Sequence, residues 1–362
     1  MEHSITHRGA GGNPDGRFER HRRETFDDGW NLAGDDPLPP LPTTVTVDAT
    51  RTIITRNDSP DIPFDRSINP YRGCEHGCVY CFARPGHSYL GLSPGLDFET
   101  RLFAKPGAAK LLEQELRKKS YRPAPIAFGT NTDPYQPIEA RFGITGKWMV
   151  MRQCLEVLDA FNHPVTIVTK GHLITRDLDL LAGMAARRLV HVGLSVTTLD
   201  RDLCRLLEPR ASVPAARLKA MRVLTAAGVP VTAMVAPVIP MLTDHELEDI
   251  LAQAAAAGAG SAVYILLRLP YEVKDLFAAW LAEHRPERAA HVLSLLAQQH
   301  GGRLNDPRFG ERMRGQGPFA QVLAQRFQLA CRKLGLNRTR GWDLDCGRFK
   351  PPLRAGDQRS LW

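Results

Sequence analysis

Residues 69–100 read NPYRGCEHGCVYCFARPGHSYLGLSPGLDFET, and this stretch holds three of the seven cysteines of the 362-residue chain. Three residues separate Cys74 from Cys78, and two separate Cys78 from Cys81. A glycine precedes each of the first two cysteines and supplies the backbone freedom that a metal-wrapping loop needs. Three thiolates on a four-iron cubane leave one iron without a protein ligand, and an open metal position is a site for chemistry. The spacing therefore predicts a metal-binding loop, which on a cubane would keep one position open for chemistry.

A zinc site built from the same cysteines is the main alternative, with His76 or His87 as the fourth ligand. Structural zinc sites usually show a second ligand pair at matching spacing, and none is visible in this sequence. Three core cysteines grouped by coincidence are a weaker alternative, because buried cysteines do not need to bracket a glycine-rich loop.

Apolar runs alternate with helical patterns after the cysteines. The expected strands are PIAFGT (125–130), PVTIVTK (164–170), LVHVGLSVTT (189–198), VPVTAMVAPV (229–238) and SAVYILLRL (261–269), with a short one at DRSINPY (65–71) before the cysteines. Nearly continuous Val, Ile and Leu runs are typical of parallel strands buried on both faces. The series predicts an α/β fold, a partial (β/α)6 TIM-like barrel that binds ligands at the carboxyl ends of its strands. An open doubly wound sheet is the alternative.

Helix starts are also visible. Thr243 and Glu246 have the spacing of a capping box, and Asp177 is placed to cap the helix that follows it.

The chain divides into three predicted parts. Residues 1–64 form an N-terminal extension, partly disordered, in which the run TVTVDATRTIITR is expected to make an edge hairpin or clasp. Residues 65–285 form the core barrel. Residues 286–362 form a helical, basic accessory region, and residues 301–362 alone carry the whole net charge of +8. Such a segment could bind nucleic acid, and a solvated basic surface is the alternative.

The sequence shows no apolar run long enough to span a membrane and no apolar core of a secretory signal near its start. The sparse, clustered cysteines favour thiolate ligation in a reducing compartment over a disulfide scaffold. A cytoplasmic protein without a membrane partner is therefore expected.

The cysteine spacing, the aromatic Tyr80 directly before the third cysteine and the parallel units that follow resemble the radical S-adenosylmethionine (SAM) superfamily. The wording YRGCEHGCVYCFARP, GLDFET, GTNTDPYQP and TIVTKG is similar to the branch near spore photoproduct lyase, often labelled DNA repair photolyase-like. This resemblance implies a 4Fe-4S cluster on Cys74, Cys78 and Cys81, with SAM chelated to the open iron. It further implies reductive cleavage of SAM to a 5′-deoxyadenosyl radical, which abstracts hydrogen from an unidentified substrate such as a nucleic-acid lesion. A reductant such as flavodoxin or ferredoxin is expected.

The same resemblance suggests residues that bind SAM. They are Tyr80, Thr132, Asp133, Lys170, Ser195, Thr197 and Arg210. Asp133 lies where the family holds the SAM amino group, although this chain lacks the commoner Gly-Gly-Glu wording. Lys170 resembles the family lysine that meets the SAM carboxylate.

Ser195 and Thr197 end the fourth strand and could contact the ribose or the methionine part of SAM. Arg210 could bind the carboxylate as a forked donor. A simple Asx turn at Asp133, an exposed lysine at Lys170 and a Glu208–Arg210 ion pair are the structural alternatives.

The substrate stays open at this stage. Modification of a protein or small molecule and a non-catalytic zinc or nucleic-acid binding module are the alternative functions. No residue beyond the cofactor ligands is assigned to catalysis, and Cys331 and Cys346 have no assigned role.

Overall fold

The computed structural model describes residues 8–19, 41–144, 149–338 and 343–353. Within these ranges a seven-stranded sheet has the order β10-β9-β8-β7-β6-β3-β2. β2 pairs antiparallel with β3, and every other pairing in this sheet is parallel. The strands are β2 (Thr55–Arg56), β3 (Arg66–Ile68), β6 (Ile126–Phe128), β7 (Val165–Thr169), β8 (Val190–Ser195), β9 (Val231–Val238) and β10 (Ser261–Leu266).

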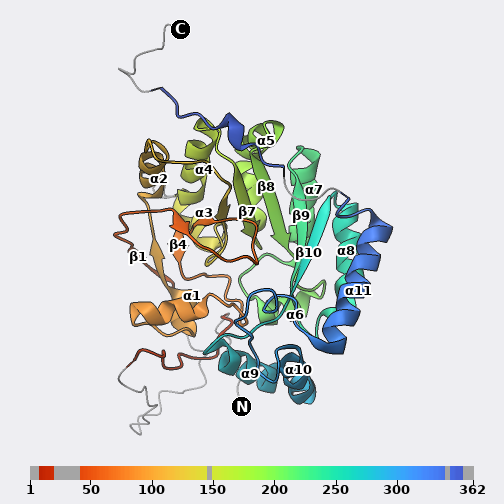
Figure 1. Cartoon of the computed structure of the whole chain (residues 1–362). Coiled ribbons are helices and arrows are strands. Elements are labelled where there is room, and N and C mark those ends of the chain that lie inside the picture. Colours follow the sequence, from red (N-terminus) through yellow and green to blue (C-terminus); the bar gives the residue numbers. More distant parts are fainter. Residues whose placement is uncertain (1–7, 20–40, 145–148, 339–342, 354–362) are drawn as a thin grey trace.

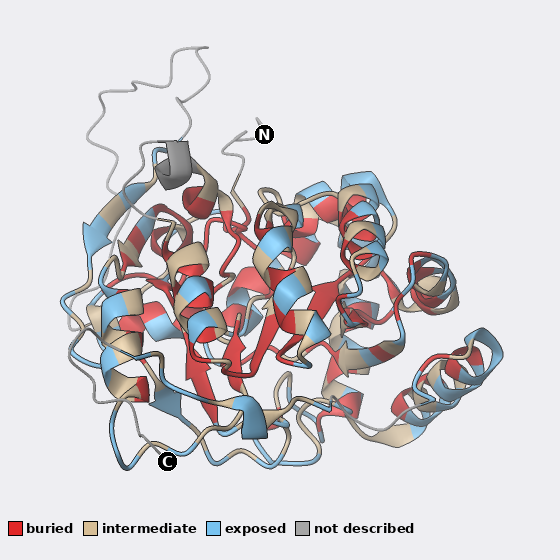
Figure 2. Ribbon diagram, turned by 90° about the horizontal axis from the view of Figure 1, so that it is seen from above, coloured by how far each residue is buried: buried red, intermediate tan, exposed pale blue. Residues whose placement is uncertain are grey.

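The six parallel strands of this sheet confirm the predicted partial barrel, which stays open. They form because their β-branched and aliphatic residues are covered on both faces, and every residue of β8 is buried. Figure 2 shows this buried centre in red, with the surrounding helices buried only on one side. Burial of apolar surface on this scale is the main source of stability.

Helices connect and cover the strands. They are α1 (Leu96–Thr100), α2 (Ala108–Leu116), α3 (Pro137–Ile144), α4 (Val150–Ala160), α5 (Leu178–Ala186), α6 (Arg201–Leu207), α7 (Pro214–Ala226), α8 (Leu247–Ala256), α9 (Val273–His284), α10 (Pro286–Gln299) and α11 (Gly317–Leu334). Short 3₁₀ helices are η1 (Arg84–Leu90), η2 (His172–Asp177), η3 (Asp244–Glu246) and η4 (Cys346–Arg348). In Figure 1, α11 lies along α8, while α9 and α10 lie together below the sheet.

A second sheet corrects one prediction. β1 (Thr44–Val47) pairs in parallel with β5 (Arg101–Ala104), and β4 (Tyr71–Arg72) pairs antiparallel with β5. β1 and β2 therefore belong to different sheets, and the predicted edge hairpin is wrong. The two strands bond to partners far along the chain, which local alternation does not specify.

Two predicted helix caps are also wrong. The Thr243 hydroxyl accepts from the backbone N–H of Ile239 at 2.9 Å, and the Glu246 carboxylate accepts from the Thr198 hydroxyl at 2.9 Å. Asp177 does precede α5, but its carboxylate accepts a hydrogen bond from the Tyr135 hydroxyl at 3.0 Å and none from a helix N–H. In each case a tertiary partner competes with the local cap.

Contacts cross both predicted domain boundaries. Arg8 donates to the backbone oxygen of Glu99 at 3.0 Å, and Arg312 forms an ion pair with Asp61. The boundaries at 64/65 and 285/286 stay predictions. No helix in the described ranges is both long and apolar enough to cross a bilayer.

Candidate active site at the three-cysteine loop

The cysteine loop follows β3 and β4 and turns tightly on itself. The backbone N–H of Cys81 donates to the Cys78 oxygen at 3.1 Å, and that of Arg84 donates to the Cys81 oxygen at 3.2 Å. Cys74 is anchored separately, because its N–H donates to the Phe98 oxygen at 2.9 Å. All three cysteines are free thiols, with Cys74 and Cys78 buried and Cys81 half-buried.

A buried ion pair supports the loop from beneath. Arg84 and Glu99 are fully buried and lie 2.5 Å apart. The same guanidinium donates to the backbone oxygens of Gly77 at 3.1 Å and Cys78 at 2.9 Å. Arg84 therefore holds the backbone between the first two cysteines in place.

The N-terminal segment 8–19 also rests on this support. The Glu99 carboxylate accepts the backbone N–H groups of Gly9 and Ala10, each at 2.9 Å. A side chain on Gly77, which has φ +68°, would lie 2.6 Å from the same carboxylate. Glycine is required there because both its conformation and its contact exclude a Cβ.

The thiols fit a cationic metal cluster. Burial raises the pKa of Cys74 and Cys78, and neighbouring negative charges, including that of Cys81, raise it further. Nearby Lys170 opposes this at Cys78 but does not outweigh burial, so three thiolates held this close would be costly without a metal cation, and the donor set is suited to a bound metal centre.

Neither histidine offered as a zinc ligand is directed to that use. The Nδ1 of His76 lies 3.3 Å from Asp133 Oδ2, and Nε2 of His87 lies 3.0 Å from the Arg101 oxygen. Within the described residues, no three His, Cys, Asp or Glu side chains are grouped to hold a single ion. Ligands of a cubane bind separate irons, so they need not converge on one point.

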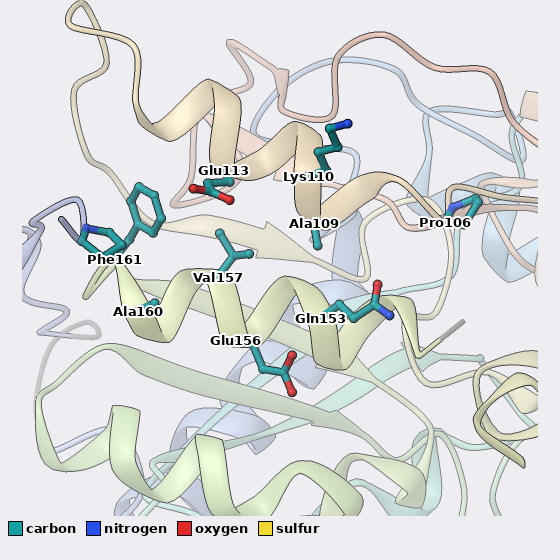
Figure 3. Close-up of a pocket in the computed structure, with 10 residues that line it drawn as sticks. Pro106, Ala109, Lys110, Glu113, Gln153, Glu156, Val157, Ala160 and Phe161 are labelled. Carbon is teal, nitrogen blue, oxygen red and sulfur yellow. The ribbon is translucent and has the colours of Figure 1, made fainter. Parts of the chain in front are cut away.

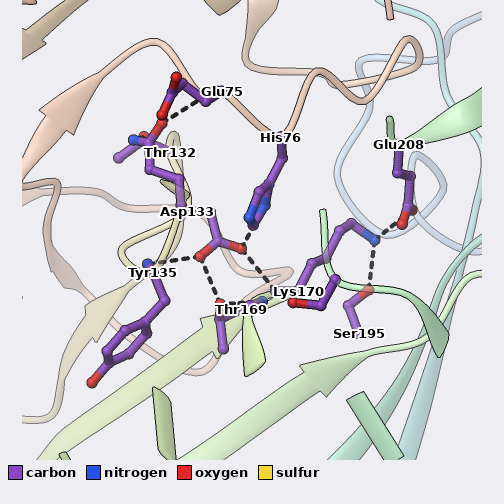
Figure 4. Close-up of polar contacts among 12 residues, drawn as sticks. Glu75, His76, Thr132, Asp133, Tyr135, Thr169, Lys170, Ser195 and Glu208 are labelled. Atoms are coloured by element: carbon purple, nitrogen blue, oxygen red, sulfur yellow. Dashed lines mark hydrogen bonds and ion pairs between the residues drawn. The ribbon is translucent and has the colours of Figure 1, made fainter. Parts of the chain in front are cut away.

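A polar cluster lies at the carboxyl ends of β7 and β8, and Figure 4 shows part of it. The Lys170 ammonium donates to the Ser195 hydroxyl at 2.9 Å and lies 3.0 Å from Glu208 Oε1. Thr197 donates to the same Oε1 at 2.6 Å, and Tyr80 donates to it as well. Three predicted SAM-binding residues, Tyr80, Lys170 and Thr197, therefore meet at one carboxylate, and Ser195 is joined to them through Lys170.

Glu208 is the centre of this cluster. Its side chain is fully buried and also pairs with the buried guanidinium of Arg217. Burial alone would raise the pKa of Glu208, but the charges of Arg217 and Lys170 lower it well below its usual value. The carboxylate is therefore ionised and links the cysteine loop, through Tyr80, to the strand ends.

Asp133 belongs to a neighbouring network. Its carboxylate accepts from the Thr169 hydroxyl at 2.6 Å and from the Lys170 N–H at 2.7 Å. It also accepts the Tyr135 N–H at 2.9 Å, which is the Asx-turn contact considered above. Burial opposes ionisation, yet His76 and these donors lower the pKa of Asp133.

Thr132 and Arg210 contact the loop from two sides. The Thr132 hydroxyl donates to the Gly73 oxygen at 2.6 Å, next to the first cysteine. Arg210 donates to Glu75 at 3.1 Å, so the alternative of a Glu208–Arg210 ion pair is wrong. Glu208 instead pairs with Arg217 on helix α7 and with Lys170, which directly follows strand β7.

Sequence reasoning missed Arg217 and gave Glu208 no role in the site. A signal for Arg217 was present, because it shares one helical face with the buried Met221 and Leu224. An arginine on an apolar helix face requires a buried anion.

A groove of about 490 Å³ lies elsewhere, between α2 and α4 (Figure 3). Lys110, Glu113, Gln153 and Phe161 line it, and none of the predicted site residues does. This groove is therefore not part of the candidate active site at the three-cysteine loop.

The fold and the site together define an open parallel α/β barrel with a three-cysteine loop after its first strand. The family model of the radical SAM superfamily matches residues 68–254, and the chain belongs to this superfamily. Members use a 4Fe-4S cluster and SAM, so the protein is an enzyme with these cofactors.

Relatives of similar sequence have no described activity. An uncharacterised protein of Mycobacterium tuberculosis is 41% identical over 236 residues, which cover 65% of this chain and 68% of that protein. An uncharacterised protein of Methanocaldococcus jannaschii is 28% identical over 182 residues, covering 49% and 62%.

Among solved structures, a spore photoproduct lyase variant with bound AdoMet and dinucleoside spore photoproduct has a TM-score of 0.56. It is 17% identical, and the match covers 81% of this chain and 80% of that chain. This similarity confirms the fold.

Proposed function

We propose that Cys74, Cys78 and Cys81 hold the 4Fe-4S cluster and that the protein cleaves SAM reductively to start hydrogen abstraction from its substrate. The observation that carries the proposal is the trio of free thiols, two buried and one half-buried, on a tightly turned loop after the first strand. When bound, the cluster supplies the electron that cleaves SAM to methionine and a 5′-deoxyadenosyl radical.

The chain's own residues position the cofactors and exclude water. Arg84 fixes the loop backbone, and Tyr80 ties the loop to Glu208. The protein supplies orientation and a closed surrounding, while the cofactor supplies the difficult chemistry.

The SAM contacts are divided between the two polar networks. Lys170, Ser195 and Thr197 share one cluster, which supports their proposed contacts with the carboxylate and ribose of SAM. Asp133 and Thr132 border Cys74 and its glycine, so the SAM amino group would meet them there. Arg210, which pairs with Glu75, would be a second group that donates hydrogen bonds to the carboxylate of SAM.

The proposal also covers the location of the protein, its electron donor and its substrate class. We place the protein in the cytoplasm, with flavodoxin or ferredoxin as the electron donor. Nucleic acid is the first substrate class to test, because the region 301–362 carries the net charge of +8. Modification of a protein or small molecule is the alternative.

Anaerobic reconstitution with iron and sulfide tests the proposal. The protein should take up about four irons per chain and, with dithionite and SAM, should release 5′-deoxyadenosine. Replacing Cys74, Cys78 or Cys81 by Ala should abolish both results.

Cys154→Ala is the matched control, because Cys154 is a buried core cysteine on α4. This variant should keep its iron and its SAM cleavage. Zinc without iron or sulfide in the purified protein, or SAM cleavage that survives loss of a loop cysteine, would overturn the proposal.

A further inference from the structure

Arg268 follows the last parallel strand, β10, and lies beside the cysteine loop. Its guanidinium carbon is 4.7 Å from the ring centre of Phe82, the residue directly after Cys81. Phe82 is 46% exposed, which is unusual for a phenylalanine on a buried loop. A cation and an accessible aromatic face therefore stand together at the carboxyl end of the barrel.

The charge of Arg268 is only partly compensated, because nearby Asp61 and Cys81 favour it but do not outweigh burial and a second cation. Among the residues that the structure describes, Arg268 has no ion pair and no hydrogen bond. Burial lowers its pKa, and the nearby charge of Arg312 lowers it further. A partly buried guanidinium beside a second cation is costly unless an anion joins it.

The second cation comes from the basic C-terminal region. The Leu266 N–H donates to the Met313 oxygen at 3.0 Å, which attaches the segment between α10 and α11 to the end of β10. This segment is the dark-blue loop above α9 and α10 in Figure 1. Arg312 lies on it, with its guanidinium carbon 4.7 Å from the ring centre of Phe309.

Arg312, unlike Arg268, is already held by protein groups. It pairs with Asp61 and donates to the Ser59 hydroxyl at 2.6 Å. Asp61 also accepts the Gly310 N–H at 2.6 Å. The Asp61 carboxylate is therefore bonded to Arg312 and Gly310, while Arg268 feels it only through space and keeps its donors unused within the described residues.

We propose that Phe82, Arg268, Phe309 and Arg312 form a binding site for a nucleotide unit of single-stranded nucleic acid. A phosphate would accept from Arg268, and a base would stack on an exposed phenyl ring. Exposed aromatic faces next to guanidinium groups are how proteins bind single strands without reading their sequence. Phe309 is 54% exposed and Phe82 46%, so both rings are accessible.

The aromatic rings decide between nucleic acid and an acidic peptide. A peptide carboxylate needs only the charge of Arg268, whereas stacked bases also use the phenyl faces. Identifying this ligand as the substrate rests on the proposed function, but its binding does not require the cluster.

Binding is measured by fluorescence anisotropy with a labelled twelve-nucleotide thymidine strand and the anaerobically reconstituted protein. Arg268→Gln should weaken binding about tenfold and lower the salt dependence by about one phosphate contact. Arg268→Lys keeps the positive charge and should restore part of the affinity and of its salt dependence. Phe82→Leu should weaken binding without changing the salt dependence.

Arg326→Gln is the control, because Arg326 lies in the same basic region but pairs with Glu248. It should bind like the parent, and a polyglutamate peptide should compete poorly. Equal losses in Arg268→Gln and Arg326→Gln, no binding by the parent, or equal competition by polyglutamate would overturn the inference.

Iron content and SAM cleavage are measured on the same samples. Protein that forms the cluster and cleaves SAM but does not bind the strand refutes only this inference. Protein that binds the strand but forms no cluster refutes only the proposed function.

Discussion

The hydroxyl of Tyr80 donates to Oε1 of Glu208, and 128 residues separate the two along the chain. Tyr80 directly precedes Cys81, so this bond joins the cysteine loop to the end of the barrel sheet. The same carboxylate binds Lys170 and Arg217, both of which are positively charged. The position of the third cysteine therefore depends on a buried charge that the loop itself does not contain.

Substitutions of Tyr80 and of Glu208 should lower the unfolding free energy by different amounts. Tyr80→Phe removes one charge-assisted hydrogen bond and should lower the unfolding free energy by about 1–3 kcal/mol. Glu208→Gln leaves the buried Arg217 uncompensated and should cost about 3–5 kcal/mol. Urea denaturation of the cluster-free protein measures both, and a larger loss in Tyr80→Phe would contradict the central role of Glu208.

Glu99→Gln should both destabilise the protein and release its N-terminal segment. It leaves Arg84 buried without a counter-charge, at a cost of about 3–5 kcal/mol. It also weakens the bonds from Gly9 and Ala10. Trypsin cleavage after Arg17 should become faster in native conditions.

The control for that experiment is Glu248→Gln, which breaks a solvent-exposed ion pair with Arg326. Its cost should stay below about 1 kcal/mol. Cleavage after Arg17 at the parent rate in Glu99→Gln would show that Glu99 does not hold the segment.

Gly129 closes β6 at the start of the GTNTDPYQP motif and should not tolerate a side chain. Its φ is +86°, and a Cβ would lie 1.9 Å from the Val168 carbonyl oxygen. Gly129→Ala should therefore cost at least about 2 kcal/mol of unfolding free energy.

Gly228→Ala separates backbone strain from collision. Gly228 has φ +79° with no atom within 4 Å of the added Cβ, so its substitution should cost only about 1 kcal/mol. Equal losses at Gly129 and Gly228 would mean that the contact with β7 is unimportant.

His163 should make stability depend on pH. Its Nδ1 lies 2.9 Å from the Pro164 oxygen and its Nε2 lies 2.7 Å from the Tyr121 hydroxyl, so the neutral ring satisfies both partners. Burial lowers the pKa of His163 to about 4. The unfolded chain binds a proton below about pH 6.5 while the native chain does not, so stability falls as pH drops from about 6.5 to 4.

The contribution of His163 is isolated by comparing the parent with His163→Gln. The parent should lose up to about 3 kcal/mol more than the variant between pH 7.5 and pH 4. Urea denaturation at several pH values gives the difference, and parallel curves for the two proteins would refute the assignment.

The sequence by itself determined the parallel strands and the cysteine loop. Both are local features, because aliphatic runs such as residues 189–198 are typical of strands buried on both faces, and three cysteines within eight residues mark the loop by their spacing alone. The superfamily could be predicted for the same reason.

Only the tertiary structure decided which charges meet. A Glu208–Arg210 ion pair was the structural alternative for these neighbours in sequence, yet Arg210 binds Glu75, while Glu208 binds Lys170 and Arg217. The predicted capping box at Thr243 is wrong for the same reason, because the Thr243 hydroxyl accepts a hydrogen bond from the backbone N–H of Ile239. Buried polar groups bond to whatever the packed barrel brings near them, and that choice depends on distances across the fold, which sequence spacing does not contain.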